Sequence, residues 1–261
     1  MAATLLLVHS PLLTPATWDV LTPHLAAAGR RVVVLDLRPL LEAPSFHTAV
    51  CAAAAAAGPA DVVAGHSRAG AYLPGIADAV GAREVVFLDA RLPHPGASWI
   101  GSLEPERARW LRESAVSGRL PSWDTWFTFD GLDAACRRVL RDLPELPWSI
   151  VSEVLPAPGP VWAAADHRYL QLSAAYRSTA DEAARRGYRV RRLDADHLAM
   201  VTRPAAVARL LCRMSAGSLS RQGERKVRYD DACAARSGTA CVDGGVDGTD
   251  HPTSRTGDPV G

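Results

Sequence analysis

Short apolar runs rich in β-branched residues alternate with alanine-rich amphipathic segments along most of the chain. This alternation is typical of a parallel sheet covered by helices. The predicted strands are Thr4–Val8, Arg31–Leu37, Asp61–Ala64, Glu84–Asp89, Arg168–Leu172 and Arg189–Leu193. The predicted helices are Thr17–Ala28, Ser45–Ala57, Arg68–Val80, Thr179–Arg186 and Pro204–Met214. We therefore expect an α/β fold with a mostly parallel, doubly wound sheet, helices on both faces and right-handed crossovers.

Residues at the predicted helix boundaries support this division. Thr17 and Ser45 occupy N-cap positions, and Pro204 stands in a first turn, where its missing N–H costs nothing. Four glycines follow helix ends, as helix C-caps often require: Gly29, Gly58, Gly81 and Gly187.

The interval 92–166 interrupts the alternation. It is rich in proline and tryptophan and contains helical stretches without clear strands. We interpret it as a helical cap inserted into a core formed by residues 1–91 and 167–214. Most of its tryptophans are expected to fill the core of the cap itself, while Trp123 and Trp126 are candidates for lining an apolar substrate pocket.

Residues 215–261 have a different composition. They are polar, rich in glycine and serine, and lack hydrophobic periodicity, so we expect a disordered tail that the chemistry does not require. The spacing of Cys233, Cys241 and His251 within it matches no metal-ligand pattern.

Composition narrows the class of protein. A chain of 261 residues that is 48% hydrophobic can form one large domain, and a net charge of +1 gives no basis for nucleic-acid binding. No apolar run reaches the roughly 18 residues of a membrane span, and the N-terminus lacks the basic region of a signal peptide. Five scattered cysteines without a CxxC pair indicate a reduced, cytoplasmic protein without a disulfide framework or a zinc site. The expected partner is a small-molecule substrate, and the sequence leaves the oligomeric state open.

The most informative motif is GHSRAG, residues 65–70. Ser67 follows a predicted strand and opens a predicted helix, so its side chain is expected to project above the sheet from a sharp turn. Such a turn demands small residues two positions before and after the serine, and Gly65 and Ala69 meet that demand. We expect Ser67 to be a nucleophile, and we expect Gly70 to allow close packing of the helix.

A serine hydroxyl is a weak nucleophile and requires a general base. In a chain with this order of strands and helices, the base is expected after the last strand. His197 follows the last predicted strand and precedes the final helix. His66 occupies the variable position of the serine motif, where we expect a packing residue or a wall of the pocket.

Several segments together resemble the α/β-hydrolase superfamily, and within it the plant methylesterase and hydroxynitrile lyase group. The similar segments are LLLVHS with ATWDVLTPHLAAAGRRVVVLDL, VVAGHSRAGAYLPGIAD, EVVFLDARLPHPG and DADHLAMVTRPAAVARLL. The resemblance extends from about Thr4 to Met214 and implies an α/β-hydrolase fold. It also implies Ser67 as nucleophile, His197 as general base and a mechanism without a cofactor.

The acid that completes such a triad is less clear, because the group's usual position after the penultimate strand carries Ala and Tyr here. The superfamily's other solution places the acid after the preceding core strand, where this chain has Asp89. We favour Asp89, with Asp166 as the alternative. Asp194 and Asp196 are too near His197 in sequence to orient its ring.

The loop after the first strand is expected to contribute to an oxyanion hole, together with the amide of Arg68. It reads VHSPLL, and Pro11 has no N–H, so the second donor must come from Ser10 or Leu12. The side chains of Arg68 and Arg91 are candidates for contacting an acidic substrate.

We therefore expect a serine hydrolase that cleaves a carboxylic ester, lactone or thioester of a mostly apolar small molecule. Two alternatives stay open: a lyase or cyclase that uses the same fold for non-hydrolytic chemistry, and a binding protein without turnover.

Overall fold

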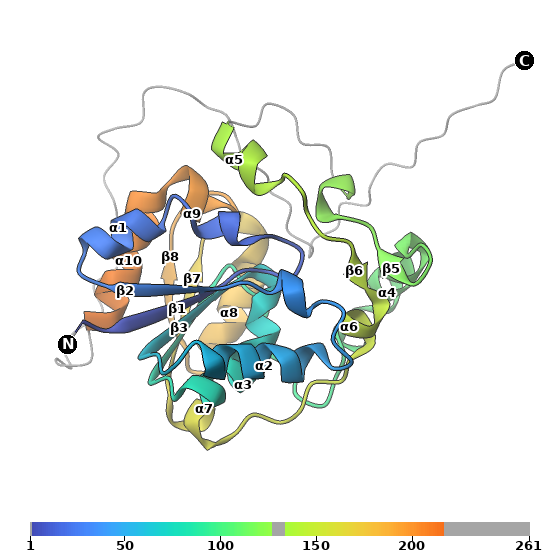
Figure 1. Ribbon diagram of the computed structural model, residues 1–261, viewed down its shortest axis with the longest axis horizontal. Coiled ribbons are helices and arrows are strands. Elements are labelled where there is room, and N and C mark those ends of the chain that lie inside the picture. Colours follow the sequence, from blue (N-terminus) through green and yellow to red (C-terminus); the bar gives the residue numbers. More distant parts are fainter. Residues whose placement is uncertain (1, 127–133, 217–261) are drawn as a thin grey trace, which may run out of the picture.

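The computed structural model describes residues 2–126 and 134–216 of the chain. Its centre is a six-stranded sheet in which every neighbouring pair is parallel, in the order β2-β1-β3-β4-β7-β8 (Figure 1). The strands are β1 (Thr4–Val8), β2 (Arg31–Leu35), β3 (Val62–His66), β4 (Glu84–Leu88), β7 (Asp166–Gln171) and β8 (Arg189–Arg192). Each matches a predicted strand to within two residues at either end. Every residue of the central strands β3 and β4 is buried, which explains their continuous apolar sequence.

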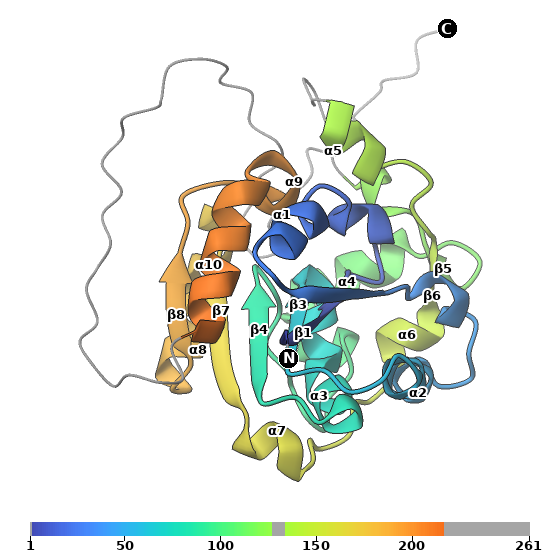
Figure 2. The same ribbon diagram turned by 60° about the vertical axis from the view of Figure 1, so that its left-hand side comes forward.

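Helices cover both faces of the sheet. On one face lie α1 (Thr22–Ala27) and α10 (Pro204–Ala216), and on the other lie α2 (Phe46–Ala56) and α3 (Leu73–Val80) (Figures 1 and 2). The shorter elements of the core are η1 (Pro15–Trp18), η2 (Arg38–Leu40), η3 (Ser67–Tyr72), η6 (Ala174–Tyr176), α8 (Arg177–Arg185) and α9 (Ala199–Thr202). The predicted α/β fold is therefore confirmed.

Two predicted helices are each divided into two pieces by a proline. In the segment 17–28, the α-helix begins only at Thr22, with Pro23 in its first turn, and Thr17 caps nothing. In the segment 68–80, α3 begins at Leu73, with Pro74 in its first turn, and the preceding residues form the 3-10 helix η3. A proline ring clashes with the carbonyl four residues earlier, so neither proline can stand inside a continuous α-helix.

Other predicted boundaries hold. The Ser45 hydroxyl accepts a hydrogen bond from the Thr48 amide at 3.2 Å and so caps α2, and Pro204 opens α10. The glycine after α3 is in the left-handed conformation expected of a C-cap, with φ of 72° at Gly81.

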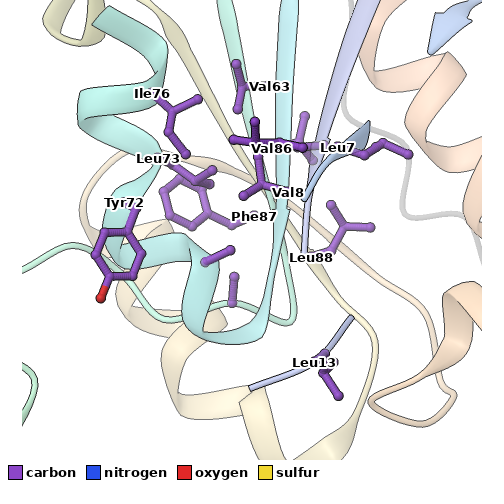
Figure 3. Packing of buried hydrophobic residues seen from close by; sticks show 14 of the residues in the cluster. Leu7, Val8, Leu13, Val63, Tyr72, Leu73, Ile76, Val86, Phe87 and Leu88 are labelled. Carbon is purple, nitrogen blue, oxygen red and sulfur yellow. The ribbon is translucent and has the colours of Figure 1, made fainter. Parts of the chain in front are cut away.

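The hydrophobic core lies on both faces of the sheet, and one part of it fills the space between α3 and the central strands. Figure 3 shows Leu73 and Ile76 of α3 beside Val63, Val86 and Phe87 of the strands. Because α3 follows directly from the segment that carries Ser67, this packing fixes the serine at the end of β3.

Most of the segment between β4 and β7 lies at the carboxyl ends of the strands, and only its last helix lies near the start of β7 (Figures 1 and 2). The segment contains η4 (Ile100–Ser102), α4 (Pro105–Ser114), β5 (Arg119–Leu120), η5 (Trp123–Thr125), α5 (Ala134–Val139), β6 (Leu146–Pro147), α6 (Trp148–Ser152) and α7 (Pro160–Ala164). The expectation of a cap without strands is wrong in one respect, because β5 and β6 pair as a small antiparallel sheet. The last helix, α7, belongs with the core: Asp78 of α3 accepts hydrogen bonds from the amides of Gly159 and Trp162.

The predicted tail, 215–261, falls almost entirely outside the described residues; only its first two residues are described, as the end of α10. Within the described part of the chain, no helix is long and apolar enough to cross a membrane.

Candidate active site

Ser67 stands on a strained turn between β3 and η3. Its φ is 56°, a left-handed value that costs a residue with a side chain of the order of 1–3 kcal/mol. The turn also needs small neighbours. A Cβ added to Gly70 would lie 2.0 Å from the carbonyl oxygen of Arg91, and one added to Gly65 would lie 2.6 Å from a methyl group of Leu73. The close packing expected at Gly70 is thus confirmed, and Ser67 itself is partly exposed.

His197 and Asp89 lie together beneath this turn. Nδ1 of His197 is 3.1 Å from Oδ2 of Asp89, and both side chains are buried. Because a carboxylate only accepts hydrogen bonds, Nδ1 carries the proton and Nε2 keeps its lone pair. This is the tautomer that a general base requires.

Asp89 is held rigidly by the end of β7. Its Oδ1 accepts a hydrogen bond from the Leu172 amide at 2.6 Å, and its Oδ2 accepts one from the Ser173 amide at 3.0 Å. The Ser173 hydroxyl also donates to Oδ2. Like Ser67, Asp89 has a left-handed φ, of 41°. Several donors and a fixed backbone therefore hold the carboxylate in one orientation.

The alternative acids are engaged elsewhere. Asp166 begins β7 at the opposite end of the sheet and pairs with Arg189 at 3.1 Å. Asp196 is next to His197 in sequence, but its oxygens accept from the Leu198 amide and the Thr202 hydroxyl. Asp89 is the carboxylate that reaches the ring of His197.

Tyr176 is a site residue that the sequence reasoning missed. Its ring stacks on that of His197, with centroids 4.9 Å apart and planes 4° from parallel. Burial is the main cause that raises the pKa of Tyr176, and the nearby Ser67 hydroxyl is a smaller cause that opposes the rise. Tyr176 therefore lies close to both Ser67 and His197. Its position just after β7 was the available signal.

His66 lies behind the site and not in a pocket wall. Its ring is fully buried, 4.4 Å from that of His197, and Nε2–H donates to the His197 carbonyl at 2.9 Å. Burial, with the nearby His197 as a smaller cause, holds the pKa of His66 well below its ordinary value. A neutral His66 therefore supports the loop that carries His197.

The loop after β1 is fixed by His9. Nε2 of His9 accepts a hydrogen bond from the Leu37 amide at 3.0 Å, so Nδ1 carries the proton and donates to the Ser10 carbonyl at 2.7 Å. Of the predicted donors in this loop, the Leu12 amide points to the Ser10 hydroxyl at 3.3 Å. The amide of Arg68 lies in the first turn of η3, where backbone N–H groups lack intrahelical partners.

The candidate pocket side chains His66, Arg91, Trp123 and Trp126 have different surroundings. The Trp123 ring is 6.3 Å from that of His197, so Trp123 lies by the site. Trp126 packs inside the cap against Trp110, and its Nε1–H donates to the carbonyl of Pro121. Trp126, like His66, is therefore a packing residue. The guanidinium carbon of Arg68, the other candidate substrate contact, is 4.1 Å from the centre of the Trp99 ring.

Arg91 is placed by the serine turn itself. Its amide donates to the Ser67 carbonyl at 3.0 Å, and its guanidinium carbon is 5.8 Å from the centre of the Tyr176 ring. The candidate substrate contacts Arg68 and Arg91 therefore both lie beside the Ser67–Tyr176 pair.

A cavity of about 400 Å³ lies away from Ser67, behind α3. It contains Cys51, whose sulfur is 3.7 Å from Nε2 of His47. Burial raises the pKa of Cys51 to about 11, so it is a neutral thiol and not a second nucleophile. The described residues contain no group of three or more side chains placed to hold a metal ion.

Solved structures with the same fold were found among enzymes. An extracellular alpha/beta-hydrolase from a Paenibacillus species is 19% identical, with a TM-score of 0.66, covering 81% of this chain and 98% of that one. Polyneuridine aldehyde esterase is 16% identical with a TM-score of 0.60, covering 82% and 100%. Tomato methylketone synthase I, as a variant complexed with beta-ketoheptanoate, is 14% identical with a TM-score of 0.60, covering 83% and 98%.

At these identities the likeness establishes the fold alone. No curated protein sequence matches the chain significantly. The sequence pattern of the alpha/beta hydrolase family, however, matches residues 5–210, which include β1, the Ser67 turn, Asp89 and His197. The chain belongs to the alpha/beta hydrolase family.

Proposed function

We propose that the protein is a serine esterase whose nucleophile is Ser67, with His197 as general base and Asp89 as the group that orients it. The observation that carries the proposal is the buried contact of 3.1 Å between Nδ1 of His197 and Oδ2 of Asp89, beneath a serine on a strained turn. This arrangement supports acyl transfer, because it leaves Nε2 unprotonated where a serine hydroxyl needs a base.

The reaction begins when the Ser67 hydroxyl turns toward Nε2 of His197. Oγ attacks the carbonyl carbon while its proton passes to Nε2, and the carbonyl π electrons move to oxygen. The tetrahedral intermediate collapses, the proton on Nε2 goes to the leaving oxygen or sulfur, and an acyl-enzyme remains. Water, activated by the same nitrogen, then releases the acid. Asp89 stabilises the imidazolium in each half.

The oxyanion is stabilised by backbone amides at the ends of β1 and β3. We assign one donor to the Arg68 amide and the other to Ser10, because Pro11 has no N–H and the Leu12 amide faces the Ser10 hydroxyl. Each such donor typically contributes about 2.7–4 kcal/mol of transition-state stabilisation.

The substrate that this site suits is a carboxylic ester, lactone or thioester of a mostly apolar small molecule. The aromatic rings of Trp99, Trp123 and Tyr176 line the surroundings of Ser67 and His197, and aromatic surfaces of this kind bind apolar groups.

A fluorophosphonate probe for activated serines tests the proposal. We expect the wild-type chain to be labelled and Ser67→Ala to remain unlabelled, while Ser149→Ala, an alteration of an exposed serine of α6, still reacts. Equal labelling of wild type and Ser67→Ala would remove Ser67 as the nucleophile, and so would no labelling of either.

The second candidate is a lyase or cyclase acting at the same site. It is favoured by the loop after β1, where Pro11 and the engaged Leu12 amide leave fewer donors for an oxyanion. Serine labelling combined with no acid release from a panel of esters, lactones and thioesters would support this candidate over the esterase.

A further inference from the structure

Arg68 is a buried cation without an anion. Only 9% of the residue is exposed, and among the described residues no carboxylate pairs with its guanidinium and no group accepts a hydrogen bond from it. Burial lowers the pKa of Arg68 to about 9, yet the group remains charged at neutral pH. A buried charge is costly to maintain unless it is paired.

Arg168, a second buried arginine, differs from Arg68 because carboxylates lie next to its guanidinium. Arg168 lies in β7 and is almost equally buried, but its guanidinium is 3.1 Å from Glu84 and 3.9 Å from Asp166. Arg68 has no equivalent partner in the described ranges. Its guanidinium is instead held over the Trp99 ring.

Other positive groups gather at the same place. Burial is the largest cause of the lowered pKa of both Arg68 and Arg107, and the charge of Arg91 is a smaller cause in each. These groups come from the serine turn, the segment after β4 and helix α4 of the cap. Among them, the buried charge of Arg68 has no carboxylate partner in the described ranges, and such a charge favours a negative ligand.

Arg68 directly follows Ser67 in the chain, and the Arg91 amide donates to the Ser67 carbonyl at 3.0 Å. The Arg91 guanidinium carbon is 5.8 Å from the centre of the Tyr176 ring, which stacks on His197. The two arginines therefore border the Ser67 turn. Arginine suits a carboxylate because its planar fork makes two parallel hydrogen bonds.

We propose that the side chain of Arg68, with Arg91 beside it, binds a free carboxylate of the substrate, so that the molecule attacked at Ser67 is an ester, lactone or thioester that also carries an acid group. This inference rests on the proposed function. It adds a charged anchor to an otherwise apolar pocket, and the anchor fixes the carbonyl relative to Ser67.

Two pairs of substrates test the proposal, each pair consisting of an ester with a free carboxylate and a neutral analogue. The quantity compared is the ratio of kcat/KM for the acid to kcat/KM for the neutral ester, measured with the same enzyme. The first pair is the para-nitrophenyl monoester of glutaric acid and para-nitrophenyl valerate. The second, with the carboxylate on the leaving group, is para-acetoxybenzoate and its methyl ester. In at least one pair we expect wild type to prefer the acid in kcat/KM, and Arg68→Met to lower the acid-to-neutral ratio about ten- to a hundredfold. Arg68→Lys should lower it less, because it keeps the charge and loses the fork.

Arg109→Met is the matched control, since Arg109 is an exposed arginine of the cap, and its ratio should equal that of wild type. An acid-to-neutral ratio that is unchanged by Arg68→Met in both pairs would overturn the anion site, while ester turnover dependent on Ser67 would leave the esterase proposal intact.

Binding to Ser67→Ala separates the two proposals when no ester is turned over. Trp99 beside the guanidinium provides a fluorescence signal. We expect para-hydroxybenzoate to bind about tenfold or more tightly than its methyl ester, and this preference to disappear in Ser67→Ala combined with Arg68→Met. A preference without catalysis would support the anion site alone, and equal binding of both ligands would contradict it.

Discussion

The positions of Ser67 and Asp89 are determined by the backbone conformation of the two turns that carry them. They follow the neighbouring strands β3 and β4, both adopt left-handed φ values, and the turns are joined by the hydrogen bond from the Arg91 amide to the Ser67 carbonyl. Strain of this kind persists only where the surroundings enforce it. His197, by contrast, comes from a loop, and it is held by Asp89, Tyr176 and His66.

The contact between Asp89 and His197 predicts a large effect of a small substitution. Asp89→Asn keeps the size of the side chain, but it removes the charge that stabilises the imidazolium and permits the wrong tautomer of His197. We expect kcat for ester hydrolysis to fall about 10⁴-fold.

Asp166→Asn is the control for this prediction, because Asp166 lies at the far end of β7 with Arg189. Its kcat should stay within about twofold of wild type, and far-ultraviolet circular dichroism should show both variants folded. A larger loss in Asp166→Asn than in Asp89→Asn would exchange the roles of the two carboxylates.

How far the site could be predicted depends on how local each signal is. Ser67 is marked by its immediate neighbours, and Asp89 by its place at the end of an apolar run. Tyr176 and His66 differ, because their roles consist of contacts with His197, which is far from both in sequence. No pattern along the chain encodes a ring stacked on another ring, so these roles emerge only from the folded structure.

At the scale of the element, the predicted strands include every strand of the main sheet, and the signal is strongest for β3 and β4, because buried parallel strands are largely apolar. Prolines account for the helices that were predicted too long. The strands β5 and β6 were missed because each has only two residues, too few to show a period.

The junction of η3 with the segment after β4 predicts a destabilising substitution. In Gly70→Ala the new methyl group would meet the backbone carbonyl of Arg91, which cannot move without displacing the Ser67 turn. We expect the free energy of unfolding, measured in urea, to fall by about 1–3 kcal/mol.

Gly65→Ala is the comparison for that experiment. Its methyl group would meet only the flexible end of the Leu73 side chain, so a smaller loss is expected. Wild-type stability in Gly70→Ala would show that the two segments are not packed as tightly as the structure indicates.

For the whole molecule, buried histidines link stability to pH. The folded pKa of His66 is depressed, so the fold favours the neutral form, whereas in the unfolded chain the group titrates near 6.5. The folded state therefore binds fewer protons below this pH. Its stability is fully present above about pH 6.5 and declines as pH falls toward the folded pKa, by up to about 1.4 kcal/mol per pH unit for this group.

Urea unfolding between pH 5 and 8 measures the effect. Burial also lowers the pKa values of His47, His94 and His167, so these groups contribute to the same pH dependence. The contribution of His66 is therefore the difference between wild type and His66→Gln in the slope of unfolding free energy against pH. The variant should show the shallower decline. Identical pH slopes would mean that His66 does not resist protonation in the folded protein.

The cap leaves the sheet after β4 and returns to it at β7, and these two strands are direct neighbours, paired from Glu84 with Asp166 to Leu88 with Leu170. The sheet ladder thus closes the base of the insertion, and α7 is tied to the core through Asp78. The part of the segment before α7 can therefore vary in length and sequence without breaking the strand pairing that places Asp89 beside the Ser67 turn.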